Sequence, residues 1–295
     1  MKVKEKTTGC ICEIELKKWG HKKIVYYINM ILCVFIAATV LIPLLWICLS
    51  SFKDTKEFLQ IPMSLFPERI DLRKVGYVLR ETRLDNSLVM TLVLSAGCVV
   101  ADLIASGLGG YALSKLKPAG HSAVLKAVFL TILMPTTMNA VPLFMFFNDL
   151  PFLHISLKDT YWPMWMMAGA NAFNILLVKS FFDGIPKAYV EAARIDGATD
   201  LNIFFRIMLP LSLPLVALIA VFAFNGSWGQ FLWPYLMIKN SDLMPLGERI
   251  YILKDNLAVD EYMMALIIMI LPVMIVFAIF QKSIMKGMSL GGIKG

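Results

Sequence analysis

Long apolar segments alternate with shorter polar ones along most of this chain. A helix needs about 20 apolar residues to cross a hydrocarbon core of ~30 Å. The apolar segments are long enough for this, and no strand-like alternation competes with them. We therefore expect an all-α membrane protein with six transmembrane helices, at about 24–50, 87–114, 124–147, 161–182, 210–238 and 262–284.

The composition agrees with this pattern. Of the 295 residues, 58% are hydrophobic and 17% are charged, and the mean hydropathy is +0.71. A soluble domain carries roughly 25% charged residues, so the composition excludes an ordinary soluble protein. The net charge of +7 fits loops beside an anionic membrane surface better than nucleic-acid binding.

The distribution of basic residues predicts the orientation. Residues 1–23 are polar and contain seven lysines, and the apolar run that follows is too long for a cleaved signal peptide. The positive-inside rule places this tail in the cytoplasm, and six spans return the C-terminus there. The long first outer loop, 51–86, also carries seven basic residues, so it does not support the rule. We expect a cytoplasmic tail 1–23, a membrane-spanning domain 24–285, a cytoplasmic loop 183–209 and a cytoplasmic tail 286–295.

The polar stretch 183–210 has the signals of two short helices outside the membrane. Pro186 suits the first turn of a helix that continues to Asp196, and Gly197 suits a stop with positive φ. Thr199 or Asp200 can cap the second helix. The order of proline, helix, glycine, cap and helix indicates a rigid surface for another protein, although a plain solvated connector is the alternative.

The residues of this loop resemble a known sequence motif. Glu191-Ala192-Ala193, Asp196-Gly197-Ala198 and then Ile207, Leu209 and Pro210 are similar to the EAA motif of permease subunits of binding-protein-dependent ABC importers. Most of the chain from about residue 26 also resembles the carbohydrate-uptake branch, specifically the maltose-type second permease subunit. This further resemblance is carried by 50–58, 85–95, 109–117, 133–144 and 280–295.

The resemblance implies a multi-pass protein of a bacterial cell membrane that works with other proteins. These are a second permease subunit, two ATPase subunits and an extracytoplasmic sugar-binding protein. The EAA loop would dock in a groove of the ATPase and couple its closure to alternating access. The residues implied in this coupling are Glu191 and Arg194 as electrostatic anchors, Ala192, Ala193, Ile195 and Ala198 as groove-filling groups, and Asp196 and Gly197 at the turn.

Polar side chains in the apolar segments are candidates for the substrate pathway. A charge at mid-bilayer costs ~2.5–3.5 kcal/mol on insertion scales, so Asp102 should face a cavity or a partner. The alternatives are that Asp102 lines the route, pairs with a partner subunit or is protonated. Amides suit sugar hydroxyls and aromatic rings suit apolar sugar faces, but asparagines also bridge helices and tryptophans also lie at membrane interfaces. The candidates are Asp102, Asn139, Asn174, Asn225, Trp228 and Gln230. Relatives often have Trp-Asn followed by an acidic residue where this chain has Trp228-Gly229-Gln230.

Small residues also recur every four positions in the second predicted span, at Gly97, Ala101, Ala105 and Gly109. Such a stripe allows another helix to approach closely. It predicts either a face that slides during transport or ordinary bundle packing.

The sequence carries no signature of an enzyme. It has no Gly-x-x-x-x-Gly-Lys-Ser/Thr phosphate loop, no His-Glu-x-x-His and no Gly-x-Ser-x-Gly. We expect no catalytic residue, no metal site and no cofactor on this chain, with ATP and Mg on the ATPase partner. The alternatives are an ABC permease for a non-sugar solute, a secondary carrier or channel, and a membrane scaffold that would leave the EAA helix unexplained.

Overall fold

The computed structural model describes the backbone of residues 19–62 and 64–291, and the side chains of residues 24–62, 64–135 and 138–281. The described residues form helices and connecting loops without any strand, which confirms the all-α prediction. The chain divides into two compact units, Met1–Leu72 and Arg73–Gly295. Most of the predicted tail 1–23 lies outside the described residues.

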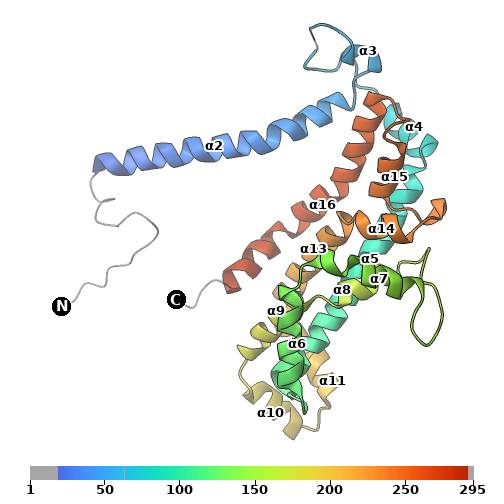
Figure 1. Cartoon of the computed structure of the whole chain (residues 1–295). Coiled ribbons are helices and arrows are strands. Elements are labelled where there is room, and N and C mark those ends of the chain that lie inside the picture. The colour runs from blue at the N-terminus through green and yellow to red at the C-terminus, as the bar shows by residue number, and fades with distance from the viewer. Residues whose placement is uncertain (1–18, 63, 292–295) are drawn as a thin grey trace. The chain divides into compact units, whose positions relative to one another are not determined.

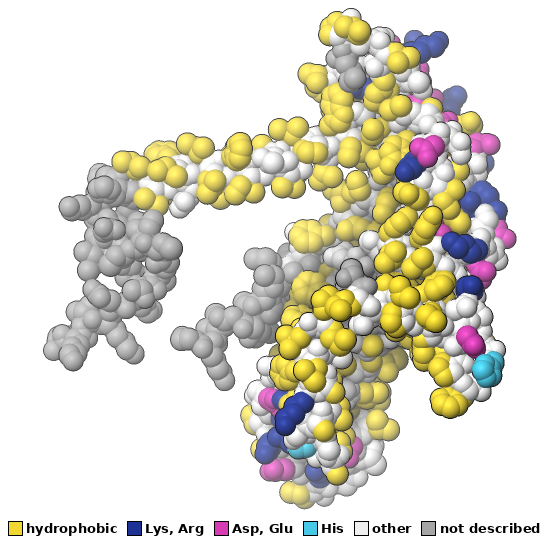
Figure 2. All heavy atoms as spheres, in the orientation of Figure 1, with side chains coloured by type: hydrophobic (Ala, Val, Ile, Leu, Met, Phe, Trp, Pro, Cys, Tyr) yellow, Lys and Arg dark blue, Asp and Glu magenta, His cyan; other side chains and the backbone are white. Residues whose placement is uncertain are grey.

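The first unit consists of one long helix and a short one. Helix α2 (Trp19–Ser50) contains the first predicted span, and hydrophobic side chains cover its surface on every visible side (Figure 2). Helix α3 (Thr55–Phe58) starts at a capping box between Asp54 and Glu57. The ammonium group of Lys53 closes the following loop, because it donates to the carbonyl of Ser64 at 2.5 Å and lies 4.4 Å from the ring centroid of Trp46.

The second unit is built around one helix. Helix α4 (Arg73–Glu81) leads into α5 (Leu84–Tyr111), which continues as the π-helix η1 (Ala112–Leu116). Helices α8 (Trp162–Gly169), α9 (Ala172–Asp183) and α13 (Leu213–Trp228) pack along α5. Within this unit, α4 and α15 lie at one end of α5, and α10 and α11 lie at the other (Figure 1).

Two predicted spans are interrupted. The segment 124–147 consists of α6 (His121–Leu133), a 3₁₀ turn at Thr136–Asn139 and α7 (Ala140–Asn148). The break falls at Pro135, where proline disfavours the α conformation of the preceding residue. The segment 161–182 breaks between α8 and α9, and the side chain of Asn171 caps the new start by accepting from the Asn174 amide.

The fifth predicted span is bent. Helix α11 (Asp200–Ile203), the π-helix η3 (Phe204–Met208) and α12 (Leu209–Leu211) meet α13 at an angle of 84°. The bend falls at Ser212, before Pro214, and the next break at Gly229 precedes α14 (Leu232–Met237).

The sixth predicted span lies in α16 (Val259–Gly291), which follows a 3₁₀ turn at Ser241–Leu243 and α15 (Leu246–Leu253). Helix α16 continues through the predicted tail boundary at 286 and ends at Gly291. Residues 292–295 lie outside the described part of the chain.

Among the described residues, continuous helices long and apolar enough to cross a membrane occupy three of the six predicted spans. They are Ile24–Ser50, Leu84–Leu116 and Val259–Gln281, and the bent pair around Ser212 would add a fourth. The other predicted spans are divided into shorter helices in the structure. The six-span count, the cytoplasmic termini and the cytoplasmic loop 183–209 therefore stay predictions.

The small-residue stripe of α5 is a packing face within the chain. A Cβ built at Gly97 would lie 2.1 Å from Nε1 of Trp165 in α8, and one at Gly109 would lie 3.6 Å from Ile175 in α9. Gly169 of α8 approaches the backbone carbonyl of Ala101 in the same way. The neighbours at this stripe are therefore α8 and α9 of the same chain.

Candidate functional site: a docking loop and a polar cavity

The loop 183–209 begins with a short helix, α10 (Ala188–Ile195). Its N-cap is Lys187, so Pro186 precedes the cap and does not lie in the first turn as expected. The carbonyl of Pro186 still accepts from the amide of Tyr189 at 3.3 Å, which tightens the entry to the helix.

The helix ends at the predicted glycine. Gly197 has φ +80°, and its amide donates to Arg194 O at 3.0 Å while the amide of Ala198 donates to Ala193 O at 2.9 Å. These two bonds form a Schellman motif, which satisfies the last carbonyls of a helix when the C′ residue is left-handed. Thr199 then caps α11 by accepting from the amide of Asn202 at 3.4 Å, which confirms one of the two predicted caps.

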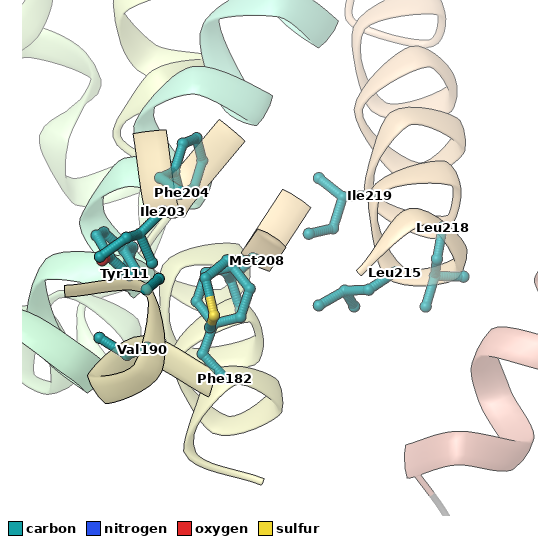
Figure 3. Packing of buried hydrophobic residues seen from close by; sticks show 11 residues of the cluster. Tyr111, Phe182, Val190, Ile203, Phe204, Met208, Leu215, Leu218 and Ile219 are labelled. Carbon is teal, nitrogen blue, oxygen red and sulfur yellow. The ribbon is translucent and has the colours of Figure 1, made fainter. Parts of the chain in front are cut away.

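The inner face of the loop is part of the core. Val190 and Ala193 of α10 are 6% and 8% exposed and belong to one apolar cluster with residues of α5, α9, η3 and α13. Figure 3 shows Val190 beside Tyr111 and Ile203, with Met208 and Phe182 next to them. Ala193, which the resemblance implies as a groove-filling group, thus lies on the side of the loop that is buried in this chain.

The outer face of the loop is open. Ile195 is 87% exposed, and Glu191 and Ala192 are also exposed. The guanidinium group of Arg194 pairs with Asp200 at 2.9 Å, and both side chains are 51% exposed. Arg194 therefore ties α10 to α11 within the chain while half of its surface stays available.

Polar bonds attach the start of the loop to two helices. Asp183, at the end of α9, accepts from Ser114 Oγ and from Lys179 Nζ, both at 2.6 Å. Lys115 Nζ donates to the carbonyl of Ile185 at 2.7 Å. Burial acts to raise the pKa of Asp183, but the hydrogen bonds from Lys179 and Ser114 outweigh it and hold the pKa below its ordinary value. The ends of α5 and α9 are thus joined to the loop by charge-assisted bonds.

A second feature is a cavity of about 210 Å³ between α5, α8 and α13. Its polar lining comes from Asp102, Asn171, Ser227 and Gln230, and its apolar lining includes Met164 and Phe222. The volume is below the ~300–1,000 Å³ of sites that enclose a drug-sized ligand, so it suits one ring of a larger molecule.

Asp102 is the charged residue of this cavity. Its side chain is 1% exposed, and Oδ2 accepts from Asn174 Nδ2 at 2.6 Å. Oδ1 is buried without a hydrogen-bond partner among the described residues. Asn174 is positioned in turn by the cap of Asn171 on α9. The structure therefore brings Asp102, Asn174 and Gln230 of the predicted pathway residues together.

The other predicted pathway residues lie elsewhere. Trp228 is 5% exposed, because its indole donates to Met269 O at 3.0 Å and stacks on Phe224. It does not line the cavity. Asn225 is exposed on α13, and Asn139 is the N-cap of α7. Asn171 and Ser227 also line the cavity, and neither belongs to the six predicted pathway residues. In the sequence, Asn171 precedes Asn174 at a cap spacing, and Ser227 lies between the predicted Asn225 and Trp228.

The described residues contain no group of three or more His, Cys, Asp or Glu side chains that could hold a metal ion. The features that remain are thus a loop with a buried inner face and an open outer face, and a small polar cavity between helices.

Known proteins resemble the chain over most of its length. The arabinooligosaccharides transport system permease protein AraQ of Halalkalibacterium halodurans is 29% identical over 270 residues, which cover 88% of this chain and 94% of that protein. The diacetylchitobiose uptake system permease protein NgcG of Streptomyces coelicolor is 27% identical over 270 residues, 90% and 87% of the two chains. The polygalacturonan/rhamnogalacturonan transport system permease protein YtcP of Bacillus subtilis is 28% identical, with coverages of 86% and 92%.

A solved structure has the same fold. It is a chain of a bacterial ABC transporter involved in the import of the acidic polysaccharide alginate, with a TM-score of 0.76 and 27% identity. The likeness covers 89% of this chain and 97% of that chain. Residues 105–290, which include the loop 183–209, match the family model of the binding-protein-dependent transport system inner membrane component. This chain belongs to that family of ABC transporter permeases, as the EAA-like letters of the loop had indicated.

Proposed function

We propose that this chain is a transmembrane permease subunit of an ATP-driven, binding-protein-dependent importer for a sugar or oligosaccharide. It forms a heterodimer with a second permease subunit and works with two ATPase subunits and an extracytoplasmic sugar-binding protein. It spans a bacterial cell membrane six times with both termini in the cytoplasm. It binds no cofactor or nucleic acid, and ATP and Mg are held by the ATPase.

The loop 183–209, which we call the docking loop, is the observation that carries this proposal. Helix α10 has an exposed outer face and a buried inner face. Such a helix suits a coupling element, because a partner protein can bind the outer face while the inner face passes the movement to the rest of this chain. The exposed Glu191, Ala192 and Ile195 form the surface for the ATPase, with Arg194 at its edge. Val190 and Ala193 transmit the displacement to the core.

The hydrogen bonds around Asp183 form a second connection between the loop and the helices α5 and α9, through which a movement of the loop can pass. Ser114 and Lys115 belong to the π-helical end of α5, and Lys179 belongs to α9. Closure of the ATPase pair moves the loop inward, and these bonds carry the ends of α5 and α9 with it. The cavity between α5, α8 and α13 then opens to alternate sides of the membrane.

The sugar assignment is supported by the names of the relatives, which are permeases for several different oligosaccharides. The chemistry of the cavity agrees with it, since Asn171, Ser227 and Gln230 both donate and accept hydrogen bonds, as sugar hydroxyls do.

The proposal is tested by purifying the tagged chain from gently solubilised membranes and assaying ATP turnover with candidate sugars. Co-purification of a second permease and an ATPase is expected, with turnover raised by the sugar-loaded binding protein. Recovery of the chain alone, with solute flux in proteoliposomes that does not respond to ATP, would instead support a secondary carrier. An assembled complex stimulated only by amino acids or phosphate would support a non-sugar permease.

A further inference from the structure

The lining of the cavity between α5, α8 and α13 contains an acidic residue and no basic residue among those that the structure describes. Among its lining residues, Asp102 is the only acidic one, and Lys, Arg and His are absent from the lining that the structure describes. The polar groups that accompany it, the side chains of Asn171, Ser227 and Gln230, are neutral. A ligand in this cavity therefore meets a carboxylate and no compensating cation.

The carboxylate is also incompletely satisfied. Asn174 occupies Oδ2 of Asp102 at 2.6 Å, whereas Oδ1 has no partner among the described residues although the side chain is 1% exposed. Buried polar atoms are normally hydrogen-bonded, and an orphaned one calls for an explanation. A hydroxyl or ammonium group of a ligand in the cavity would supply the missing donor.

The carboxylate of Asp102 is held in place by hydrogen bonds from other residues of this chain. Asn171 caps α9 through the amide of Asn174, and Asn174 then donates to Asp102 across the interface between α9 and α5. The Asp102 side chain is therefore oriented before any ligand arrives, and preorganised acceptors discriminate best between ligands.

The geometry points to a cargo whose glycosyl units carry hydroxyl or amino groups but no carboxylate, with one donor bound to Oδ1 of Asp102. A uronic-acid unit would bring a second negative charge close to the buried carboxylate of Asp102, and like charges at short range repel. This inference rests on the proposed sugar import and narrows it. The matched relatives do not decide the point, because their names include a permease for polygalacturonan and an importer of acidic alginate as well as permeases for arabinooligosaccharides and diacetylchitobiose.

The test uses the complete importer, reconstituted with its binding protein, and four probes. These are arabinotriose and diacetylchitobiose as neutral sugars, chitobiose as an amino sugar and trigalacturonate as an acidic one. Contact with the permease complex is also measured without the binding protein, by saturation-transfer NMR in nanodiscs, because the binding protein selects what is delivered.

Asp102→Asn is the informative variant, since it removes the charge and keeps an oxygen that accepts from Asn174. Asp149→Asn is the matched control, because Asp149 lies in an exposed loop beside His154. We expect at least one neutral or amino sugar to be bound and imported by the wild type, with affinity reduced roughly tenfold in Asp102→Asn. Trigalacturonate should show no contact with the wild type and a measurable contact with Asp102→Asn. Asp149→Asn should behave as the wild type.

Import of trigalacturonate by the wild type, unchanged in Asp102→Asn, would overturn this inference and leave sugar import standing. Equal affinity of the neutral probes for the wild type and Asp102→Asn would overturn it as well. Failure of the proposed function has a different signature, in which the assembled complex imports none of the four sugars and its ATP turnover responds only to a non-sugar solute. In that case both conclusions fall.

Discussion

Single residues in this chain are constrained by close contacts and by burial. Gly97 lies against the indole of Trp165, whose Nε1 donates to Leu94 O at 3.1 Å. Glu248 in α15 is 2% exposed, and its Oε2 has no partner among the described residues. We therefore expect substitutions at Gly97 and at Glu248 to change the stability of the second unit.

Gly97→Ala should destabilise the protein by about 1–3 kcal/mol, the usual cost of overpacking. The new methyl group would lie 2.1 Å from Trp165 Nε1, so the indole must move and lose its bond to Leu94. Thermal unfolding of the purified chain in detergent measures the effect. Gly76→Ala in α4 is the control, because a Cβ there meets nothing within 4 Å. Equal melting temperatures for Gly97→Ala and the wild type would contradict this packing.

The stability should also depend on pH through Glu248. Burial raises the pKa of Glu248 to about 7, while Lys239 and Arg249 act to lower it and Asp159 acts to raise it. In the unfolded chain a glutamate has a pKa of ~4.3. The folded state therefore binds the proton more tightly, and the stability due to this group is fully present below about pH 4 and is lost as pH rises to about 7.

We accordingly expect a lower melting temperature at pH 8 than at pH 5.5 in the wild type. In Glu248→Gln this part of the difference should disappear, because the amide does not titrate. Melting curves in detergent at both pH values check it, and an unchanged pH slope in Glu248→Gln would rule out Glu248 as the source.

At the scale of elements, the shape of the docking loop depends on residues that are close in sequence. Its attachment to the helix bundle depends on residues that are far away in sequence. The Schellman end at Gly197 and the cap at Thr199 use neighbours in the sequence. The bonds from Ser114 and Lys115 come from the end of α5, about 70 residues away in the chain. The loop is therefore a preformed helix pair that is fixed to the bundle by tertiary contacts.

Gly197→Pro should abolish coupled uptake while leaving the chain in the membrane. Proline fixes φ near −65° and has no N–H, whereas Gly197 has φ +80° and donates to Arg194 O. Uptake and ATP turnover of the reconstituted importer are measured at equal membrane abundance. Gly120→Pro is the control, because Gly120 also has a positive φ, of +84°, but lies at the start of α6. Wild-type uptake by Gly197→Pro would remove the loop from the coupling mechanism.

At the scale of the whole molecule, the interrupted helices leave the topology as the main question. The three continuous apolar helices are α2, α5 with η1, and α16, while the segments between them are broken at Pro135, Asn171 and Ser212. Broken helices are tolerated at membrane depth where the freed backbone lies in protein or lines a cavity. The breaks before α9 and after α13 meet this condition, because Asn171 and Gln230 line the polar cavity.

Side-specific labelling should detect the proposed six-span arrangement. Ile195→Cys lies in the docking loop at 87% exposure, and Phe152→Cys lies between α7 and α8 at 99%. In a chain whose own cysteines are replaced by serine, a membrane-impermeant maleimide should label Phe152→Cys in intact spheroplasts. Ile195→Cys should react only after the membrane is permeabilised. Labelling of both positions from the same side would contradict the topology.

Local order and chemistry along the chain were sufficient to predict the helical class, three long apolar helices among the described residues, and the helix of the loop 183–209 with its stop at Gly197. These features depend on propensities and apolar runs that act over a few turns, so they can be read without knowing the fold. Family membership followed from the same loop, because all residues of its motif lie within one short stretch of the sequence, between 191 and 210.

Only the tertiary structure decided which side of α10 is buried and which polar residues share a cavity. Ala193 and Ala192 are alike in sequence, yet Ala193 is buried because it belongs to the apolar cluster that α10 forms with other helices of the unit. Asp102 and Asn174 are 72 positions apart and meet because α9 packs on α5, whereas Trp228 turns toward Met269 on α16. Such choices depend on which helices become neighbours, and that follows from the packing of the whole unit.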